Sequence, residues 1–178
     1  MTLTAKIVYE LFDCDPLTGK LYWKRRASRW FATGRACSVW NAKHATKEAF
    51  TYKDCDGYFM GRIFGKSYFA HRIIYFHSYG WLPQEVDHLN GKPSDNRIMN
   101  LRAVTRAQNQ QNRRLQHNNT SGYAGVYFDK QRKVWRGNVW HNGKKHSCGY
   151  SETKEGAHIA VLTKRKELGG FTERHGKA

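Results

Sequence analysis

The sequence predicts an α+β protein made of short helices and small antiparallel sheets, and three stretches predict this class. Residues 86–112 are expected to form a strand, a polar loop, a second strand and a helix. Residues 125–150 have the pattern of three strands, with Asn142-Gly143 as a hairpin turn, and the helix that follows is expected to pack on their sheet. Turns at 56–57 and 65–66 bracket a smaller hairpin. We therefore predict three domains, at 1–69, 70–117 and 118–178.

The chain is strongly basic. It has 31 Lys and Arg against 14 Asp and Glu among 178 residues, a net charge of +17. Such an excess predicts a polyanionic partner or an anionic membrane surface. No apolar run approaches a membrane span, and the N-terminus lacks the apolar region of a signal peptide. Nucleic acid is therefore the expected partner, and no membrane partner is expected.

Cysteine usage predicts a reduced, intracellular protein. The four cysteines form no C-x-x-C pair, and no histidine stands at zinc-finger spacing from any of them. This pattern argues against a zinc ribbon.

The first domain is expected to begin with a helix capped by Thr4, followed by a turn at 15–19 and a strand at 21–23. Residues 24–50 have poor periodicity, and their Arg and Lys alternate with Trp30, Phe31 and Trp40. This mixture suits phosphate contacts with stacking, and equally a solvated loop anchored by a few aromatic side chains. Both interpretations remain open for this segment.

Residues 71–80 predict a helix closed by a C-terminal glycine, Gly80. Its first residue, His71, is interpreted as a packed or capping histidine and not as a catalytic one. A linker, 81–85, leads into the next strand.

Residues 86–112 carry polar side chains at each junction between elements. Asp87-His88 ends the first strand, residues 101–104 form the second, and Thr105 and Gln108 have the pattern of a capping box for the helix. A phosphodiester hydrolase needs a base for the attacking water and a divalent cation on the phosphate. His88 is the natural base because its ordinary pKa lies near neutrality.

The other groups of this stretch suit the remaining tasks. Asp87 can ligate a metal, Asn100 can hydrogen-bond the second imidazole nitrogen, and Asn109 can offer an amide oxygen to the same cation. Such oxygen ligands suit Mg²⁺ or Mn²⁺ better than zinc. Read alone, Asp87-His88 is also compatible with two ordinary polar side chains that face solvent.

The string Asp87-His88, Asp95-Asn96-Arg97, Asn100-Leu101 and Asn109 resembles the HNH endonucleases of phages and mobile introns. The resemblance implies a ββα-metal fold with His88 as general base, Asp87 and Asn109 as metal ligands, and Asn100 orienting the base. The sequence departs from many relatives at Asn109, where they have His. Asn112, one turn further along the helix, is the competing ligand.

The last domain presents two faces on its middle strand. Trp135, Gly137 and Val139 point one way, under the helix that Thr153 caps. The opposite face is predicted to meet a DNA groove, or to be the wet face of an ordinary amphipathic sheet. Its members are Arg136, Asn138, Trp140, Lys145, Ser147 and Tyr127.

The segments 119–126, 133–135, 142–144, 149–150 and 153–157 resemble the Apetala (ethylene-response-factor) DNA-binding domain. That family lays a three-stranded sheet in the major groove, and the resemblance implies that Arg136, Asn138, Trp140 and Lys145 lie on the DNA-reading face. The charge agrees, because residues 101–178 hold 16 basic and 5 acidic residues, which leaves 16 − 5 = +11.

These observations predict a site-selective, divalent-metal-dependent endonuclease of the homing type that cuts double-stranded DNA. The alternative is a non-catalytic sequence-specific DNA-binding protein, and an RNA-binding module comes third. No small-molecule cofactor beyond Mg²⁺ or Mn²⁺ is expected. A monomer in the cytoplasm, that of the bacterial host if a phage encodes the protein, is expected.

Overall fold

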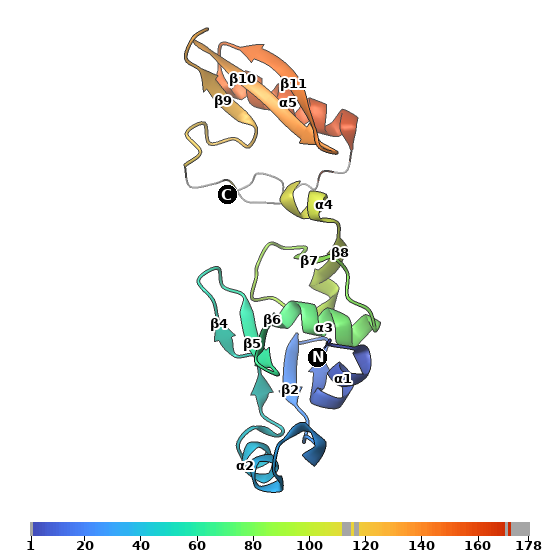
Figure 1. Cartoon of the computed structure of the whole chain (residues 1–178). Helices are drawn as coiled ribbons and strands as arrows, with labels where there is room; N and C mark the ends of the chain where they lie inside the picture. Colours follow the sequence, from blue (N-terminus) through green and yellow to red (C-terminus); the bar gives the residue numbers. More distant parts are fainter. Residues whose placement is uncertain (1, 112–114, 116–117, 170, 172–178) are drawn as a thin grey trace. The chain divides into compact units, whose positions relative to one another are not determined.

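The computed structural model of the chain describes residues 2–111, 115, 118–169 and 171. The chain divides into two compact units, residues 1–104 (unit 1) and 105–178 (unit 2). Each unit combines small antiparallel sheets with helices (Figure 1). The predicted α+β class is confirmed in this general form.

Unit 1 contains three small sheets, with strand orders β1-β2-β3, β4-β5-β6 and β7-β8. Its strands are β1 (Phe12–Asp15), β2 (Lys20–Trp23), β3 (Glu48–Ala49), β4 (Tyr52–Lys53), β5 (Phe59–Ile63), β6 (Lys66–Phe69), β7 (Glu85–His88) and β8 (Leu101–Val104). Its helices are α1 (Ala5–Leu11), η1 (Ser28–Trp30), α2 (Gly34–His44), α3 (Ala70–Tyr79) and η2 (Ile98–Asn100), of which η1 and η2 are 3₁₀ turns.

Local signals set the ends of two of these helices. The Thr4 hydroxyl accepts from the backbone N–H of Ile7 and caps α1. Gly80 ends α3 at φ 73°, a left-handed conformation that glycine adopts without strain. Both ends agree with the sequence analysis.

One hydrophobic core holds unit 1 together. It joins Val8 and Leu11 of α1 to Ile73 and Ile74 of α3, and it extends to Val86 of β7. Residues 1–69 and 70–104 therefore share their interior, across the domain boundary predicted after residue 69. The strand pair β7–β8 packs against the N-terminal region through this core.

Helix α2 lies in the segment for which sequence periodicity predicted no regular element. The Thr33 hydroxyl accepts from Ala36 N–H at 3.1 Å and starts the helix. Its inward side carries Cys37, Trp40 and Asn41, so few aliphatic side chains mark the buried stripe. The apolar periodicity that normally reveals an amphipathic helix is therefore missing.

Unit 2 is a three-stranded sheet with a helix on one face. Its elements are α4 (Arg106–Gln111), β9 (Val126–Asp129), β10 (Val134–His141), β11 (Lys144–Ser151) and α5 (Lys154–Leu168). The strand order is β11-β10-β9, and α5 packs across the sheet (Figure 1). Residue 117, the second predicted domain boundary, lies outside the described residues.

Side chains of β9, β10 and α5 form a separate core in unit 2, made by Val126, Val139, Ala157 and Val161. Gly137 allows the close approach of α5, because a Cβ there would lie 2.8 Å from a methyl carbon of Val161. Within the described residues, no helix combines the length and apolar character needed to cross a membrane.

Candidate active site

Strands β7 and β8 place an acid and an imidazole next to each other in a buried position. Their antiparallel register pairs Asp87 with Arg102 and His88 with Leu101. Val86 and Leu101 belong to the core of unit 1 and anchor the two strands. The polar pair is thus held on a rigid ladder.

Asp87 is paired with a cation across the ladder. Its side chain is 8 % exposed, and Arg102 donates to its Oδ2 from Nη2 at 2.7 Å and from Nε at 3.2 Å. A buried carboxylate needs such compensation to remain charged. The ion pair with Arg102 therefore offsets the cost of burying the Asp87 carboxylate at the end of β7.

His88 is held by an amide and surrounded by aromatic rings. It is 4 % exposed, and its Nε2 lies 3.0 Å from Oδ1 of Asn96. An amide oxygen accepts and cannot donate, so this contact places the ring proton on Nε2 and the basic lone pair on Nδ1. The rings of His71 and Tyr58 lie with their centroids 4.9 and 5.8 Å from that of His88.

His71 is a buried histidine in contact with the candidate base. It is 6 % exposed and packs between Tyr58, Phe69 and His88. Burial, with a smaller contribution from His88, lowers the pKa of His71 from 6.5 to about 3. This imidazole is therefore neutral at physiological pH, in agreement with the packed role expected for it.

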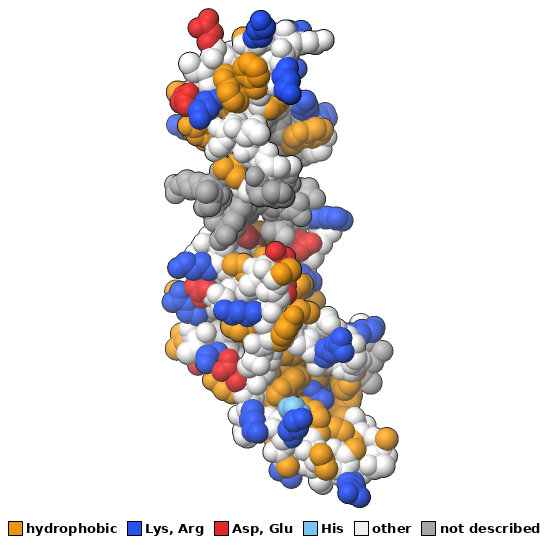
Figure 2. Space-filling model, turned by 90° about the vertical axis from the view of Figure 1, so that its left-hand side faces the viewer, with side chains coloured by type: hydrophobic (Ala, Val, Ile, Leu, Met, Phe, Trp, Pro, Cys, Tyr) orange, Lys and Arg blue, Asp and Glu red, His pale blue; other side chains and the backbone are white. Residues whose placement is uncertain are grey.

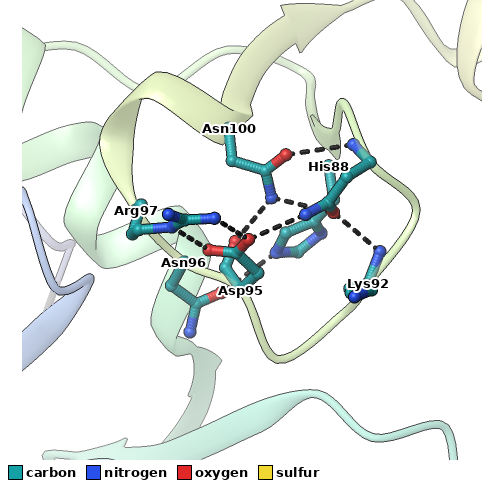
Figure 3. Close-up of polar contacts among 7 residues, drawn as sticks. His88, Lys92, Asp95, Asn96, Arg97 and Asn100 are labelled. Carbon is teal, nitrogen blue, oxygen red and sulfur yellow. Dashed lines mark hydrogen bonds and ion pairs between the residues drawn. The ribbon is translucent and has the colours of Figure 1, made fainter.

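Asn100 closes the loop between β7 and η2 through a reciprocal pair of hydrogen bonds. Its Oδ1 accepts from the backbone N–H of Asn90 at 3.0 Å, and its Nδ2 donates to Oδ1 of Asn90 at 3.0 Å and to the carbonyl of Asp95 at 2.7 Å (Figure 3). The backbone N–H of Leu89 also donates to the carbonyl of Asn100 at 2.8 Å. These bonds fix the two ends of the loop together.

Asp95 stabilises the same loop. Arg97 donates to both of its carboxylate oxygens, at 2.8 and 2.7 Å, and Asn90 Nδ2 donates to Oδ2 at 2.7 Å (Figure 3). The hydrogen bonds from Arg97, reinforced by Asn90, hold the pKa of Asp95 well below its ordinary value. Asp95 is therefore ionised and engaged within the loop.

The turn between β1 and β2 supports this loop from behind. The carbonyl of Pro16 accepts from Ile98 N–H at 2.9 Å. Gly19, at φ 70°, lies so close to the loop that a Cβ would come 2.7 Å from the carbonyl oxygen of Asn96. A residue with a side chain does not fit there, so the N-terminal hairpin fixes the position of Asn96.

The structure brings together some of the residues singled out from the sequence. Asp87 and His88 lie side by side at the end of β7. Asn100 is 8 % exposed in the adjoining loop, where its side chain bonds Asn90 and Asp95. The side-chain oxygen on the imidazole belongs to Asn96, for which the sequence suggested no role although the quoted motif contains it.

The proposed helix ligand belongs to unit 2. Asn109 lies on α4, and its backbone N–H donates to the carbonyl of Thr105 at 2.9 Å. The predicted capping box is present, because Gln108 N–H donates to the Thr105 hydroxyl and Thr105 N–H donates to the Gln108 amide oxygen, at 3.2 and 2.9 Å. The competing ligand, Asn112, lies outside the described residues.

The two predicted metal ligands are both oxygen donors. Among the described residues there is no group of three or more His, Cys, Asp or Glu side chains that could hold a metal ion. The predicted set contains one carboxylate, Asp87, and one amide oxygen, Asn109. Oxygen donors with the remaining positions left to water and phosphate suit Mg²⁺.

In unit 2 the register assembles the six predicted DNA-contacting residues on adjacent strands. Cross-strand partners are Arg136 with Tyr127, Asn138 with Ser147, and Trp140 with Lys145. Trp140 is 62 % exposed.

Asn138 differs from the exposed position expected for it. It is 7 % exposed, and its Nδ2 donates to the Tyr127 hydroxyl at 2.8 Å. A register shift between Arg136 and Asn138 accompanies this burial, because a bulge breaks the simple alternation of faces.

Comparisons with known proteins agree with this geometry. Residues 68–111 match the model of a family described as HNH endonuclease. The chain is 33 % identical over 86 residues to Protein 3.8 of Escherichia phage T7, an alignment that covers 48 % of this chain and 71 % of the phage protein. No solved structure matches the chain.

Proposed function

Because residues 68–111 match the HNH endonuclease family and the chain belongs to the same family as Protein 3.8 of Escherichia phage T7, we propose that it is a divalent-metal-dependent endonuclease that hydrolyses phosphodiester bonds of double-stranded DNA. The observation that carries this proposal is the pair Asp87-His88 at the end of β7, with the His88 ring fixed by Asn96 at 3.0 Å. The family resemblance adds a homing role, in which the enzyme cuts DNA to promote insertion of its own gene.

His88 is the general base of this proposal. With its Nε2 proton donated to Asn96, the imidazole receives a proton from the attacking water at Nδ1. The neutral neighbour His71 adds no positive charge that would oppose this protonation. Asn100 acts on the base through the loop, because its bonds to Asn90 and Asp95 set the backbone path that carries Asn96.

Asp87 and Asn109 are the proposed ligands of Mg²⁺ or Mn²⁺. The cation would neutralise charge that develops on the non-bridging oxygen and the leaving group of the phosphate. Until the cation binds, Arg102 balances the Asp87 carboxylate. The metal therefore has to compete with this guanidinium for Oδ2.

Unit 2 is the proposed DNA tether, and it would act in the manner of the Apetala domain that its sequence resembles. The family match ends at residue 111, so this role rests on the charge of residues 105–178, where 15 basic and 5 acidic residues leave 15 − 5 = +10, and on the exposed side chains of the sheet. Arg136, whose guanidinium lies 5.3 Å from the ring centroid of Tyr150, is a candidate for base readout. Lys145 is a candidate for a phosphate contact.

A non-catalytic DNA-binding protein is the second candidate, and the Asp87–Arg102 ion pair favours it. A carboxylate that Arg102 engages through two N–H groups is stable without a metal. The two candidates differ in whether Mg²⁺ displaces the guanidinium and permits cleavage.

Supercoiled-plasmid cleavage with and without Mg²⁺ tests the proposed activity. We expect His88→Ala to lower the rate by about 10²–10⁴-fold, the usual contribution of a positioned base, while the affinity for DNA is retained. Asp87→Ala should abolish cleavage, whereas Asn109→Asp, which keeps an oxygen ligand, should retain part of it. Cleavage by His88→Ala at the parent rate would refute the base assignment, and a parent protein that binds but never cuts would establish the second candidate.

Fluorescence anisotropy with matched and scrambled duplexes tests the tether. Arg136→Ala should relax specificity at one base position by about 1–3 kcal/mol if it makes a bidentate contact to guanine. Lys145→Ala should weaken binding to all sequences alike. If neither change altered affinity at low salt, unit 2 would not be the tether.

A further inference from the structure

Residues 24–47, here called the basic lobe, form a strongly charged part of unit 1 that the proposed nuclease mechanism does not use. The lobe contains seven Lys and Arg and no Asp or Glu. It comprises η1, α2 and their connections. Figure 1 shows α2 at the end of unit 1 that is opposite to β7 and β8. A ligand that touched both places would have to extend along the unit.

The aromatic side chains of the lobe pack against other rings and against the guanidinium of Arg26. The guanidinium of Arg26 lies 4.5 Å from the ring centroid of Trp23 and 3.9 Å from that of Trp40. Phe31 packs on Trp40, and Trp30 stacks on Phe64. These rings are therefore engaged with one another and do not form a platform for unstacked bases.

Asn41 fixes the same cluster from α2. It is buried, its Oδ1 accepts from Arg26 N–H at 2.9 Å, and its Nδ2 donates to the Arg26 carbonyl at 2.9 Å. This two-bond clamp joins the helix to the chain that precedes it. The lobe is thus a folded support and not the solvated loop of the second interpretation, and its packed rings do not provide the stacking of the first.

The support presents cations outward. Residues Arg35, Val39 and Lys43 of α2 are exposed and recur every four residues, so they lie along one side of the helix. The two charges are separated by about 12 Å along the axis, at 1.5 Å per residue. The flanking Ser38 and Ala42 are small, and the exposed Val39 is the one large apolar side chain between the two cations.

Four of the seven cations have no acidic partner within the described residues. Arg29 is paired with Glu10 at 2.6 Å and Lys24 with Asp13 at 3.1 Å, and Arg26 is enclosed by rings. The exposed and uncompensated cations are Arg25, Arg35, Lys43 and Lys47. On the face drawn in Figure 2, the lower end of unit 1 shows Lys and Arg side chains without Asp or Glu.

We infer that the basic lobe binds the phosphodiester backbone of duplex DNA away from the bond that is cut, without reading bases; this inference rests on the proposed function. Four uncompensated cations on a rigid support match a regular array of phosphates. A single strand would require exposed rings for stacking. An anionic membrane surface would require several exposed bulky apolar side chains to insert, whereas among the large apolar side chains of the lobe only Val39 is exposed.

The test compares two double variants of the full-length chain that remove the same charge. Arg35→Gln with Lys43→Gln removes two cations of the lobe. Lys6→Gln with Lys66→Gln removes two exposed cations of unit 1 outside the lobe. Binding to a fluorescent duplex of random sequence is measured by anisotropy in EDTA over a range of KCl concentrations, so that no cleavage occurs.

Each lost phosphate contact lowers the slope of log K against log salt by about 0.9. We expect the lobe variant to lose about 1.8 from the slope and the control variant to keep the parent slope. An increase from 50 to 200 mM salt is fourfold, and four raised to the power of about 1.8 is about 12. The affinity of the parent for duplex DNA should therefore fall about 12-fold more than that of the lobe variant over this range. Equal slopes for the parent and the lobe variant, or equal losses in both double variants, would overturn the inference.

Two further arms identify the ligand and separate the inference from the nuclease proposal. If the lobe variant lost binding to single strands or to anionic vesicles but not to duplex, duplex DNA would be the wrong partner. Plasmid cleavage is measured on the same proteins. A parent that fails to cut while the lobe variant shows the reduced slope refutes the nuclease and retains the lobe. A parent that cuts while the slope is unchanged refutes the lobe alone.

Discussion

Replacing His71 should change how the stability of unit 1 depends on pH. The pKa of this histidine is lowered from 6.5 to about 3, mainly by burial, so the native state leaves it neutral where the unfolded chain protonates it. Between these two values the unfolded state binds the extra proton. Stability due to His71 is therefore fully present above pH 6.5 and falls as the pH drops toward 3.

The magnitude follows from the two pKa values. Each pH unit inside that window changes the free energy of unfolding by about 1.4 kcal/mol. Lowering the pH from 7 to 5 crosses about 1.5 pH units of the window. The titration of His71 alone should therefore lower the free energy of unfolding by about 2 kcal/mol. His88 and Arg72 are the other titratable groups that affect this pKa, and both disfavour a second positive charge.

The assay is urea unfolding at pH 7 and pH 5 in EDTA, followed by tryptophan fluorescence. Trp135 and Trp140 are replaced by Phe, so that the signal no longer comes from the sheet of unit 2. His71→Gln, which does not titrate, should reduce the loss of stability between the two pH values by about 2 kcal/mol. His146→Gln, a histidine of unit 2, serves as the control. If the free energy of unfolding fell by the same amount between pH 7 and pH 5 in the parent and in His71→Gln, His71 would not be neutral in the native protein. The argument from burial would then fail.

Three other substitutions test single contacts. Asn96→Asp should move the acidic limb of the pH–rate profile for cleavage to higher pH, because a carboxylate on Nε2 favours protonated His88; an unmoved limb would contradict the tautomer assigned here. Arg102→Ala leaves the Asp87 carboxylate without its guanidinium, so Mg²⁺ should raise the melting temperature of this variant more than that of the parent, and equal shifts would show that the metal does not use Asp87. Val161→Ala, at a fully buried position in unit 2, should cost about 2 kcal/mol in chemical denaturation, and a negligible loss would show that α5 does not hold the sheet.

Features set by neighbouring residues were predictable from the sequence. The Asn142-Gly143 turn is formed by two left-handed residues, at φ 49° and 75°. The Thr105 and Gln108 capping box and the Gly80 helix end depend on contacts within one turn of helix. Asp87 and His88 could be found because adjacent residues on a strand need no tertiary information to be placed.

Features set by long-range packing were not predictable. Asn96 reaches His88 only because the intervening loop folds back, and nothing in its spacing shows which of the asparagines 90, 96 and 100 meets the ring. The burial of Asn138 depends on the hydroxyl of Tyr127, which lies eleven residues away on another strand. Helix α2 is held by a guanidinium that packs on two indoles and not by an aliphatic stripe, so hydrophobic periodicity does not reveal it.

The contact between the β1–β2 turn and the loop that carries Asn96 limits how this chain can be recombined with others. The family match begins at residue 68, yet Pro16 and Gly19 bear on the backbone at Asn96 and Ile98 from a hairpin fifty residues before that point. A fragment that begins at residue 68 keeps the motif but lacks the β1–β2 turn. It therefore loses the contacts that position Asn96 against His88. Chimaeras that exchange DNA-recognition parts should therefore join this chain after β8, and gene shuffling should preserve residues 1–104 as one inherited block.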